Sequence, residues 1–391
     1  MKRFKYILRT FVALVLICVT TKVAANDSIQ ISLITCGPGN EVWAQYGHTA
    51  IRFKDMRNNA DLAINYGMFS SSQPYFIPRF IFGLTDYCVG VISFSDFMAE
   101  YQYEGRGVKE QVLDISDADK EAIRAALAEN LKPENITYRY NFFYDNCTSR
   151  ARDMIINHLQ GKVVYPERRH IKDSFRDLIH EWNYDYPWIQ TGEDALLGVQ
   201  ADMHTSKEEQ QFLPQNLFDD FSHATYNGKK LVKETNILLQ QPAKVVESSF
   251  PFSPMDIALF LLILGTLIYY LEYKKKKIYW GWDLFLMLAS GLPGIVLFLM
   301  LFSQHPCVRL NLLIFIANPL PLFMAFRAIK RIRNHQPDKW WVVWEIMLII
   351  GLAGGLIQQY PISITIMALI LLMNCIMKTT KFVRTDKKEA E

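Results

Sequence analysis

Two residues whose side chains suit nucleophilic chemistry lie far apart in this chain of 391 residues. His48 stands in the segment QYGHTAIRF (residues 45–53), and Cys147 stands in NFFYDNCTSR (residues 141–150). A cysteine beside a histidine base is an activated nucleophile on several folds. The alternatives are ordinary, because a lone cysteine is more often a small core residue and a lone histidine a surface or core residue. Together the two residues predict one active site that uses a thiolate.

The elements that would position His48 are strands of an antiparallel sheet. Apolar and polar residues alternate over residues 29–34, 49–53, 62–66 and 108–115, with the period of a half-buried strand. The turn sequence MRNNAD separates the second strand from the third, which predicts a hairpin with His48 at its leading edge. The returning strand contains INYG, and it brings Asn65 or Tyr66 near the imidazole.

The element that would position Cys147 is the first turn of a helix. Residues at the spacing of an amphipathic stripe follow it: Cys147, Arg150, Ala151, Met154, Ile155 and His158. The start of a helix lowers the pKa of a thiol, because the macrodipole and the free N–H groups stabilise the thiolate. The same N–H groups can hold an oxyanion. A further amphipathic helix is predicted over residues 117–131.

Several residues near the pair have two interpretations each. An amide at Asn65 would hold the imidazole in one tautomer, as a catalytic triad requires, but a strand residue beside a turn is an equally ordinary role. Tyr144, Asp145 and Asn146 would line the site or donate to an oxyanion, whereas capping the helix is the simpler role for Asp145 and Asn146. Tyr66 is a further candidate for the substrate pocket.

Two arginines beside the motifs are candidates for contact with a phosphate headgroup. Arg52 follows His48 on the same predicted strand, and Arg150 follows Cys147 on the same predicted helix. A guanidinium binds phosphate oxygens through its fork of N–H donors. Solvation, or pairing with a carboxylate of the protein, is the simpler alternative for both residues.

The second half of the chain is built from apolar segments. Half of all residues are hydrophobic, and five runs have about the length that a hydrocarbon core of roughly 30 Å requires: residues 255–271, 282–302, 310–327, 340–357 and 362–377. Fourteen basic residues lie in the first and third connections and in the tail, against Arg309 in the turns between them. By the positive-inside rule the C-terminus is cytoplasmic. These patterns predict a multi-pass protein of the inner (cytoplasmic) membrane.

The N-terminus has the pattern of a secretory signal peptide. Basic residues precede a short apolar core, and small residues end at Ala25, after which cleavage is predicted; an uncleaved anchor is the alternative. Cys18 is a weak lipidation candidate, because bulky Ile17 precedes it. The predicted organisation is a signal peptide (1–25), a periplasmic catalytic domain (26–250), a transmembrane helical domain (251–378) and a cytoplasmic basic tail (379–391).

Cysteine use and charge exclude some classes of site. Three of the six cysteines lie in the segment predicted outside the cytoplasm, so an oxidising compartment would pair two of them. Cys36 and Cys88 are candidates for that disulfide, which leaves Cys147 as a free thiol. The cysteine and histidine spacings contain no metal motif, and no cofactor is predicted. A formal net charge of +3 gives no indication of nucleic-acid binding.

Four segments carry a resemblance to a known family: GPGNEVWAQYGHTAIRF, INYG, YNFFYDNCTSRARDMI and FLPQNLFDDF. They resemble the Lnb N-terminal periplasmic domain family, the lipoprotein N-acyltransferases of Bacteroidota. The resemblance covers residues 29–224, and the appended membrane helices are similar in layout. A histidine strand before a cysteine helix is also similar to circularly permuted papain-like domains of the NlpC type. The resemblance implies an α+β periplasmic domain of that type, followed by a transmembrane bundle of about five helices.

The resemblance also implies a reaction. Cys147 would take an acyl chain from a phospholipid as a thioester with His48 as its base, and the chain would pass to the α-amine of the diacylglyceryl-cysteine of a lipoprotein. The partners are then a phospholipid donor, a diacylated lipoprotein acceptor and the membrane. One alternative is a membrane-anchored NlpC-like cysteine peptidase or amidase acting on cell-wall peptides with the same pair. Another is a non-catalytic protein of envelope assembly.

Overall fold

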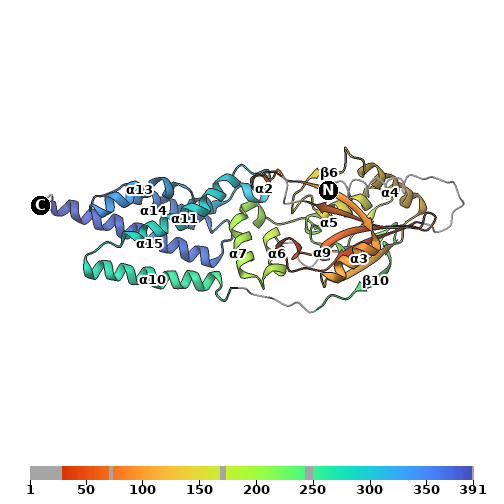
Figure 1. Ribbon diagram of the computed structural model, residues 1–391, viewed down its shortest axis with the longest axis horizontal. Coiled ribbons are helices and arrows are strands. Elements are labelled where there is room, and N and C mark those ends of the chain that lie inside the picture. Colours follow the sequence, from red (N-terminus) through yellow and green to blue (C-terminus); the bar gives the residue numbers. More distant parts are fainter. Residues whose placement is uncertain (1–28, 70–73, 168–172, 243–249, 390–391) are drawn as a thin grey trace. The chain divides into compact units, whose positions relative to one another are not determined.

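The computed structural model describes residues 29–69, 74–167, 173–242 and 250–389 (Figure 1). The predicted signal peptide, residues 1–25, and Cys18 lie outside these residues. The described chain divides into two compact units. The second unit holds residues 183–203 together with the described residues from 250 onward, and the first unit holds the rest.

An antiparallel sheet of seven strands forms the first unit, in the order β10-β5-β1-β2-β3-β4-β6. Its strands are β1 (Ile29–Cys36), β2 (His48–Asp55), β3 (Ala60–Met68), β4 (Asp86–Ser93), β5 (Val108–Leu113), β6 (Thr137–Arg139) and β10 (Val232–Leu239). The four predicted strands are confirmed as β1, β2, β3 and β5. Strands β4, β6 and β10 were not predicted. β2, which begins at His48, is the central strand.

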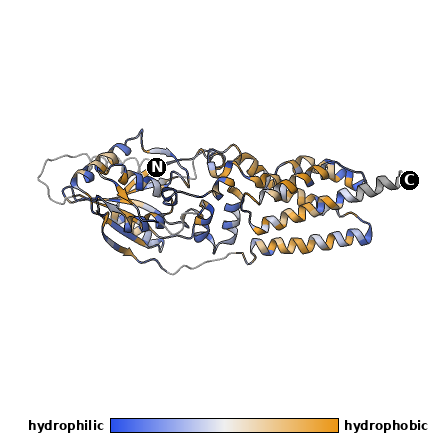
Figure 2. Cartoon of the chain, turned by 180° about the vertical axis from the view of Figure 1, so that it is seen from behind, coloured by the Kyte–Doolittle hydropathy of each residue, from blue (hydrophilic) through white to orange (hydrophobic). Residues whose placement is uncertain are grey.

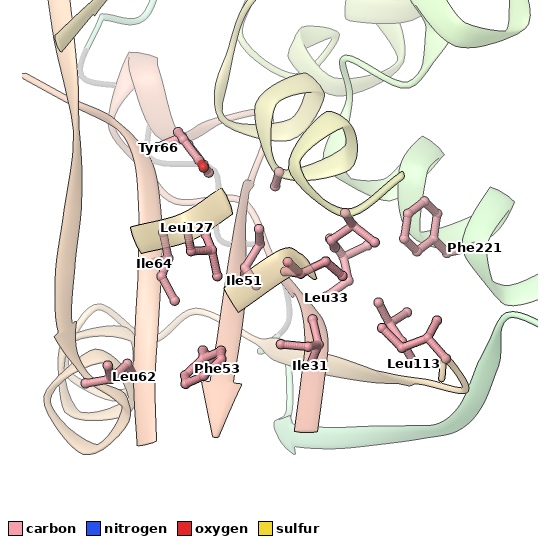
Figure 3. Close-up of a cluster of buried hydrophobic side chains, with 14 of the residues drawn as sticks. Ile31, Leu33, Ile51, Phe53, Leu62, Ile64, Tyr66, Leu113, Leu127 and Phe221 are labelled. Carbon is pink, nitrogen blue, oxygen red and sulfur yellow. The ribbon is translucent and has the colours of Figure 1, made fainter. Parts of the chain in front are cut away.

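Helices cover both faces of this sheet. On one face α4 (Asp117–Asn130), α5 (Cys147–Ile156) and α9 (Pro214–His223) pack over aliphatic side chains of the strands. Figure 3 shows this core, where Leu33, Ile51 and Ile64 lie near Leu127 of α4 and Phe221 of α9. Burying one such side chain stabilises a fold by about 1.5–3 kcal/mol. This core therefore holds α5 against β2, and the opposite face packs on α3 (Phe94–Tyr103).

Shorter elements complete the first unit. They are η1 (Val42–Ala44), α2 (Phe76–Ile81), most of α6 (Phe175–Asn183), α8 (Lys207–Gln210), and a small sheet of β7 (Val163–Val164), β8 (Thr225–Tyr226) and β9 (Lys229–Lys230). Both η1 and α2 flank the strands that carry the conspicuous motifs, since η1 precedes β2 and α2 follows β3.

The candidate disulfide between Cys36 and Cys88 is not formed. Cys36 ends β1 and Cys88 lies on β4, with β2 and β3 between them. Neighbouring strands lie about 4.8 Å apart, so the two residues are separated by roughly 14 Å. A disulfide requires Cα atoms within about 7 Å. The pairing expected from the cysteine count was therefore wrong.

The second unit is helical and apolar, as Figure 2 shows by its colouring. Its helices are α7 (Pro187–Leu196), η2 (Val199–Asp202), α10 (Pro254–Lys275), α11 (Trp280–Met300), α12 (Pro306–Arg309), η3 (Leu312–Phe315), α13 (Leu320–Arg333), α14 (Trp340–Gly354) and α15 (Ile362–Glu389). In the described residues four segments are long and apolar enough to cross a membrane: Pro254–Lys275, Trp280–Met300, Pro306–Arg333 and Ile362–Thr380. The fifth predicted segment, residues 340–357, contains the shorter apolar helix α14.

Residues 183–203 belong to the second unit, although the sequence predicted a single domain over residues 26–250. The N–H of Gly198 donates to the carbonyl of Cys307 at 2.7 Å, and the N–H of Val199 donates to that of Leu310 at 2.8 Å. The amide of Gln358 donates to the carbonyl of Leu197 at 3.0 Å. No local pattern marks this segment, because its partners lie more than a hundred residues later in the chain.

A buried ionic cluster joins three helices of the second unit. The ammonium of Lys378 on α15 lies 3.1 Å from carboxylate oxygens of both Glu272 on α10 and Asp283 on α11. Asn374 donates a further hydrogen bond to Asp283 at 2.9 Å. Buried charges persist in an apolar interior when they are paired in this way, and here the pairing links the three helices.

Candidate active site

His48 enters the site from the first position of β2. Its backbone pairs with Cys36 at the end of β1. The preceding residue, Gly47, has a φ of +80°, in the left-handed region that favours glycine. A Cβ at Gly47 would lie 2.5 Å from the carbonyl oxygen of Cys36. Glycine is therefore needed for the turn that leads into His48.

Cys147 is the first residue of α5, as the helical spacing predicted. The side-chain oxygen of Asn146 accepts hydrogen bonds from the backbone N–H groups of Thr148 and Ser149, both at 2.9 Å. In return, the hydroxyl of Ser149 accepts from the N–H of Asn146 at 2.9 Å, which completes a capping box. An N-cap stabilises a helix by about 1 kcal/mol. The cap sets the start of α5, and so keeps the thiol in its first turn.

The histidine, the asparagine of the returning strand and the cysteine meet at this end of the sheet. His48 Nε2 and Asn65 Oδ1 are 3.1 Å apart. A carbonyl oxygen can only accept, so Nε2 carries the hydrogen and Nδ1 is the nitrogen left for the sulfur. Cys147 and His48 lie close enough for each side chain to shift the pKa of the other through charge and hydrogen bonding. The structure thus brings together the three residues that the sequence proposed as catalytic.

Gly67 allows the cysteine to approach β3 closely. It has a φ of +84°, and the pairing of β3 with β4 shifts register between Asn65 and Met68. A Cβ at Gly67 would lie 3.6 Å from the Cβ of Cys147 and 3.9 Å from the ring of Tyr140. Bulges of this kind re-aim side chains at active sites. Here the bulge leaves room for Cys147 and Tyr140 to pack beside the strand.

The surroundings of the pair favour the ionised thiol. Burial raises the pKa of Cys147, but the charge and hydrogen bond of His48, the backbone N–H of Thr49 and the hydroxyl of Thr148 outweigh burial and lower that pKa to about 7. Burial lowers the pKa of His48, but the charge and hydrogen bond of Cys147 and the hydrogen bond of Asn65 outweigh it, so this pKa is raised. Near neutral pH the pair favours thiolate and imidazolium.

The reaction of Cys147 with iodoacetamide is expected to follow an apparent pKa of about 7. Because the thiolate is the reacting form, the rate will rise with pH through this value and level off by about pH 8, below the ordinary cysteine pKa of about 8.5. In a His48→Ala variant the midpoint will move above about 8.5. Burial raises the pKa of Cys147, and the variant lacks the imidazole that does most to lower it. Mass spectrometry of the Cys147 peptide measures the rate.

Cys36 is the internal control for this titration, because burial raises the pKa of its thiol to about 12. It should stay unlabelled over the same pH range. A midpoint near about 8.5 for Cys147 in the unaltered protein would contradict the description of the pair as thiolate and imidazolium.

Two predicted site residues have other partners. The side-chain amide of Asn146 donates to the carbonyls of Phe142 at 2.9 Å and Phe212 at 2.8 Å. Its donors are engaged, so the capping alternative is favoured over an oxyanion role. Tyr66 lies in the hydrophobic core beside Leu127 (Figure 3), and its hydroxyl donates to Asn130 at 2.8 Å. Successive strand residues point to opposite faces, so Tyr66 points away from the face that carries Asn65.

Tyr144, Arg150 and Arg52 are also placed away from the pair or are engaged elsewhere. Tyr144 packs on Phe175 and lines a cavity of about 310 Å³ whose lining does not include Cys147 or His48. Arg150 makes two hydrogen bonds with Asp145, at 2.6 and 2.7 Å, and lies over a tyrosine ring. Arg52 is paired with two carboxylates, those of Asp61 and Glu110. The structure favours protein pairing over a headgroup for both arginines.

Three residues at the site escaped the sequence analysis. The backbone N–H of Thr49 helps to lower the pKa of Cys147, the hydroxyl of Thr148 lies 3.8 Å from the sulfur, and Tyr140 lies with Cys147 beside Gly67. The two threonines adjoin the motif residues in sequence, which is a usable signal. Tyr140 has no such signal, because its place depends on the bulge in β3.

Comparison with known proteins finds two families in this chain. The Lnb N-terminal periplasmic domain family matches residues 19–175. The Lnb transmembrane domain family matches residues 245–386. Neither the curated proteins nor the solved structures provided a match. The first match contains His48, Asn65 and Cys147, and the second contains the apolar helices α10–α15.

Proposed function

This chain is an Lnb-type membrane protein with a periplasmic N-terminal domain, and we propose that it is a cysteine-dependent lipoprotein N-acyltransferase. The acyl donor is a membrane phospholipid, and the acceptor is the α-amine of the diacylglyceryl-cysteine at a lipoprotein's N-terminus. The observation that carries the proposal is the array of Cys147, His48 and Asn65 inside the matched periplasmic domain.

The first half-reaction forms a thioester. The thiolate of Cys147 attacks the ester carbonyl of the phospholipid and forms a C–S bond. The ester C–O bond then breaks, which leaves the acyl chain on the sulfur as a thioester. The imidazolium of His48 gives its Nδ1 proton to the departing glycerol oxygen, which leaves as the hydroxyl of a lysophospholipid. Asn65 keeps Nε2–H occupied throughout, so Nδ1 faces the sulfur.

The second half-reaction forms the amide. The neutral α-amine of the lipoprotein attacks the thioester carbonyl, His48 Nδ1 takes one proton from the amine nitrogen, and Cys147 leaves as a thiolate. An α-amine has a pKa of about 8, so a usable fraction is neutral near pH 7. The thioester lasts long enough for this step where water is kept from it.

The backbone N–H of Cys147 is the donor that we assign to the oxyanion of both tetrahedral intermediates. The N–H groups of Thr148 and Ser149 are already bonded to Asn146, and the N–H of Arg150 is bonded to the carbonyl of Asn146. The N–H of Cys147 lies at the positive end of α5, where developing negative charge is stabilised.

The proposal includes the placement of the chain. The signal-peptide pattern over residues 1–25 and the basic residues in the first and third connections support a multi-pass protein of the inner membrane with a cytoplasmic C-terminus. Donor and acceptor are both anchored in lipid. A membrane-held catalytic domain therefore meets them in two dimensions, and orientation can contribute several kcal/mol to lowering the barrier.

Mass spectrometry of lipoprotein N-termini tests the reaction. Lipoproteins from cells that carry this protein should have N-acylated termini, and lipoproteins from cells that lack it should have free α-amines. With the phospholipid alone, the purified protein should carry an acyl adduct on the Cys147 peptide that hydroxylamine removes. Cleavage of cell-wall peptides without any acyl adduct would instead support the peptidase or amidase, which would use the same pair of Cys147 and His48.

Substitution of Asn65 tests its role in positioning His48. Asn65→Leu has nearly the same shape but removes the acceptor for Nε2–H, so we expect acyl transfer to fall by about tenfold to a hundredfold through a misplaced imidazole. Asn65→Asp keeps an acceptor and should retain most of the activity. The pH profile of Cys147 alkylation should move in the leucine variant alone. Equal losses in both variants would leave Asn65 a purely structural residue.

A further inference from the structure

An exposed group of apolar side chains, which we call the aromatic surface, lies on η1, on the residue after β3 and on α2. It consists of the exposed side chains of Val42, Trp43, Phe69, Ile77 and Phe80, that of Tyr75 immediately before α2, and the half-buried ring of Phe76, which contacts Phe69 and Phe80. Trp43 is 69% exposed and Ile77 is 70% exposed. Covering large apolar side chains is favourable, so a contiguous exposed patch of this kind marks an interaction site.

Ring contacts make this surface continuous. The ring of Phe69 lies 6.4 Å from that of Trp43 and 5.9 Å from that of Phe76. Phe76 in turn lies 6.3 Å from Phe80. The helix α2 contains one charged residue, Arg79, and Asp86 pairs with it. The surface therefore presents aromatic and aliphatic groups around a neutralised charge.

The same rings lead inward to the thiol. Phe69 lies 5.0 Å from Tyr87, and Tyr87 stacks on Tyr140 at 4.1 Å. Tyr140 and Cys147 then lie side by side against Gly67. A series of ring contacts, which we call the ring path, thus leads from the exposed surface to Tyr140, which lies with Cys147 beside Gly67.

We propose that the aromatic surface is where the periplasmic domain takes up its phospholipid, with one acyl chain lying along the ring path toward Cys147. This inference rests on the proposed function. A single acyl chain extends about 15 Å, half of a hydrocarbon core of about 30 Å. From Tyr140 through Tyr87 and Phe69 to Phe76, successive ring centroids lie 4.1, 5.0 and 5.9 Å apart. The ring path therefore matches an acyl chain in length as well as in polarity.

Lipid is the occupant because of the continuity with the thiol and the matched transmembrane domain. The thioester that Cys147 would form brings a long apolar chain to the position beside Tyr140. That chain needs an apolar path away from the sulfur, and the ring path begins at that point. The transmembrane domain anchors the protein in a membrane, where phospholipid is the abundant apolar ligand. A second copy of the protein or a protein partner would use the surface without needing the ring path.

Photo-crosslinking in liposomes tests the binding directly. The full-length Cys147→Ala protein, which cannot react, is reconstituted with a phospholipid that carries a diazirine at the end of one acyl chain. After irradiation, mass spectrometry should find lipid on the peptides that contain Trp43, Phe69 and Phe80, at least tenfold above the peptides of Tyr103 and Ile237. Those two residues are also exposed, at 94% and 63%, but lie outside the aromatic surface. Helices α10 and α11 provide the internal positive control.

A matched pair of variants tests the consequence for catalysis. Ile77→Ser changes the aromatic surface, and Ile237→Ser changes an isoleucine of similar exposure on β10. We expect Ile77→Ser to lower the rate of Cys147 acylation by phospholipid at least fivefold, while Ile237→Ser leaves it unchanged. Alkylation of Cys147 by iodoacetamide and the melting temperature should be the same in both variants, since neither residue touches the pair.

The outcomes separate this inference from the proposed function. Lipid labelling of the aromatic surface without any acylation of Cys147 in the unaltered protein would contradict the transferase proposal and support the lipid site. Acylation of Cys147 with labelling confined to the transmembrane helices would support the transferase proposal and overturn the lipid site. Concentration-dependent crosslinks between two copies through Trp43 in place of lipid labels would also overturn it.

Discussion

Replacing Cys147 by serine is expected to abolish acyl transfer, with a loss of about 10⁴-fold or more. A serine hydroxyl is not ionised near pH 7, whereas the thiol has a pKa of about 7 beside His48. The hydroxyl therefore cannot supply the anionic nucleophile that the first half-reaction uses. Lipoproteins from cells that carry only this variant should retain a free α-amine, as mass spectrometry of their N-terminal peptides would show.

Cys88→Ser is the matched control for this variant. Cys88 is also a partly exposed cysteine of the first unit that is in no disulfide, and its thiol donates to the carbonyl of Met68. That variant should keep full activity. If lipoproteins stay fully N-acylated with Cys147→Ser, the thioester mechanism fails, and an activity that disappears with Cys88→Ser as well would point to a general loss of the fold.

Replacing His48 by alanine should lower acyl transfer by about 10²- to 10⁴-fold, the range expected when a general base is removed. His48 has two tasks here, since it holds Cys147 as a thiolate and moves the proton in both half-reactions. The residual activity should rise steadily toward alkaline pH, because the isolated thiol then ionises only above its ordinary pKa. Initial rates of thioester formation between about pH 6 and 9.5 would show this change.

His223→Ala is the control for this second prediction. His223 is exposed on α9, and its Nδ1 contacts the carbonyl of Asp219 at 2.8 Å. That variant should behave as the unaltered protein does. A pH profile for His48→Ala that keeps the original midpoint would show that another group ionises the thiol.

Much of the site was predictable because the relevant signals are local. The alternation of apolar and polar residues around His48 and INYG predicted a hairpin, and the structure has β2 and β3 with Asn65 beside the imidazole. The spacing after Cys147 predicted a helix that begins at the cysteine, and α5 does so. Periodicity of this kind reports directly which face of a strand or helix is buried.

The roles of the neighbouring polar residues were not predictable in the same way. Asn146, Tyr66 and Arg150 stand next to the motifs, and their side chains are engaged by Phe212, Asn130 and Asp145. Two of these partners are distant in the chain. Nearness in sequence therefore placed the residues close to the site without showing which atoms were already bonded.

The sequence alone determined the thiol, its histidine, the elements that carry them and the apolar character of the second half of the chain. These follow from residue type, spacing and local hydropathy. The tertiary structure decided what depends on partners far away: the separation of Cys36 and Cys88, which form no disulfide, the membership of residues 183–203 in the helical unit, and the ring path beside Gly67. The physical reason is the same in each case, because the strand order and the long-range hydrogen bonds that settle these features arise only when the chain packs.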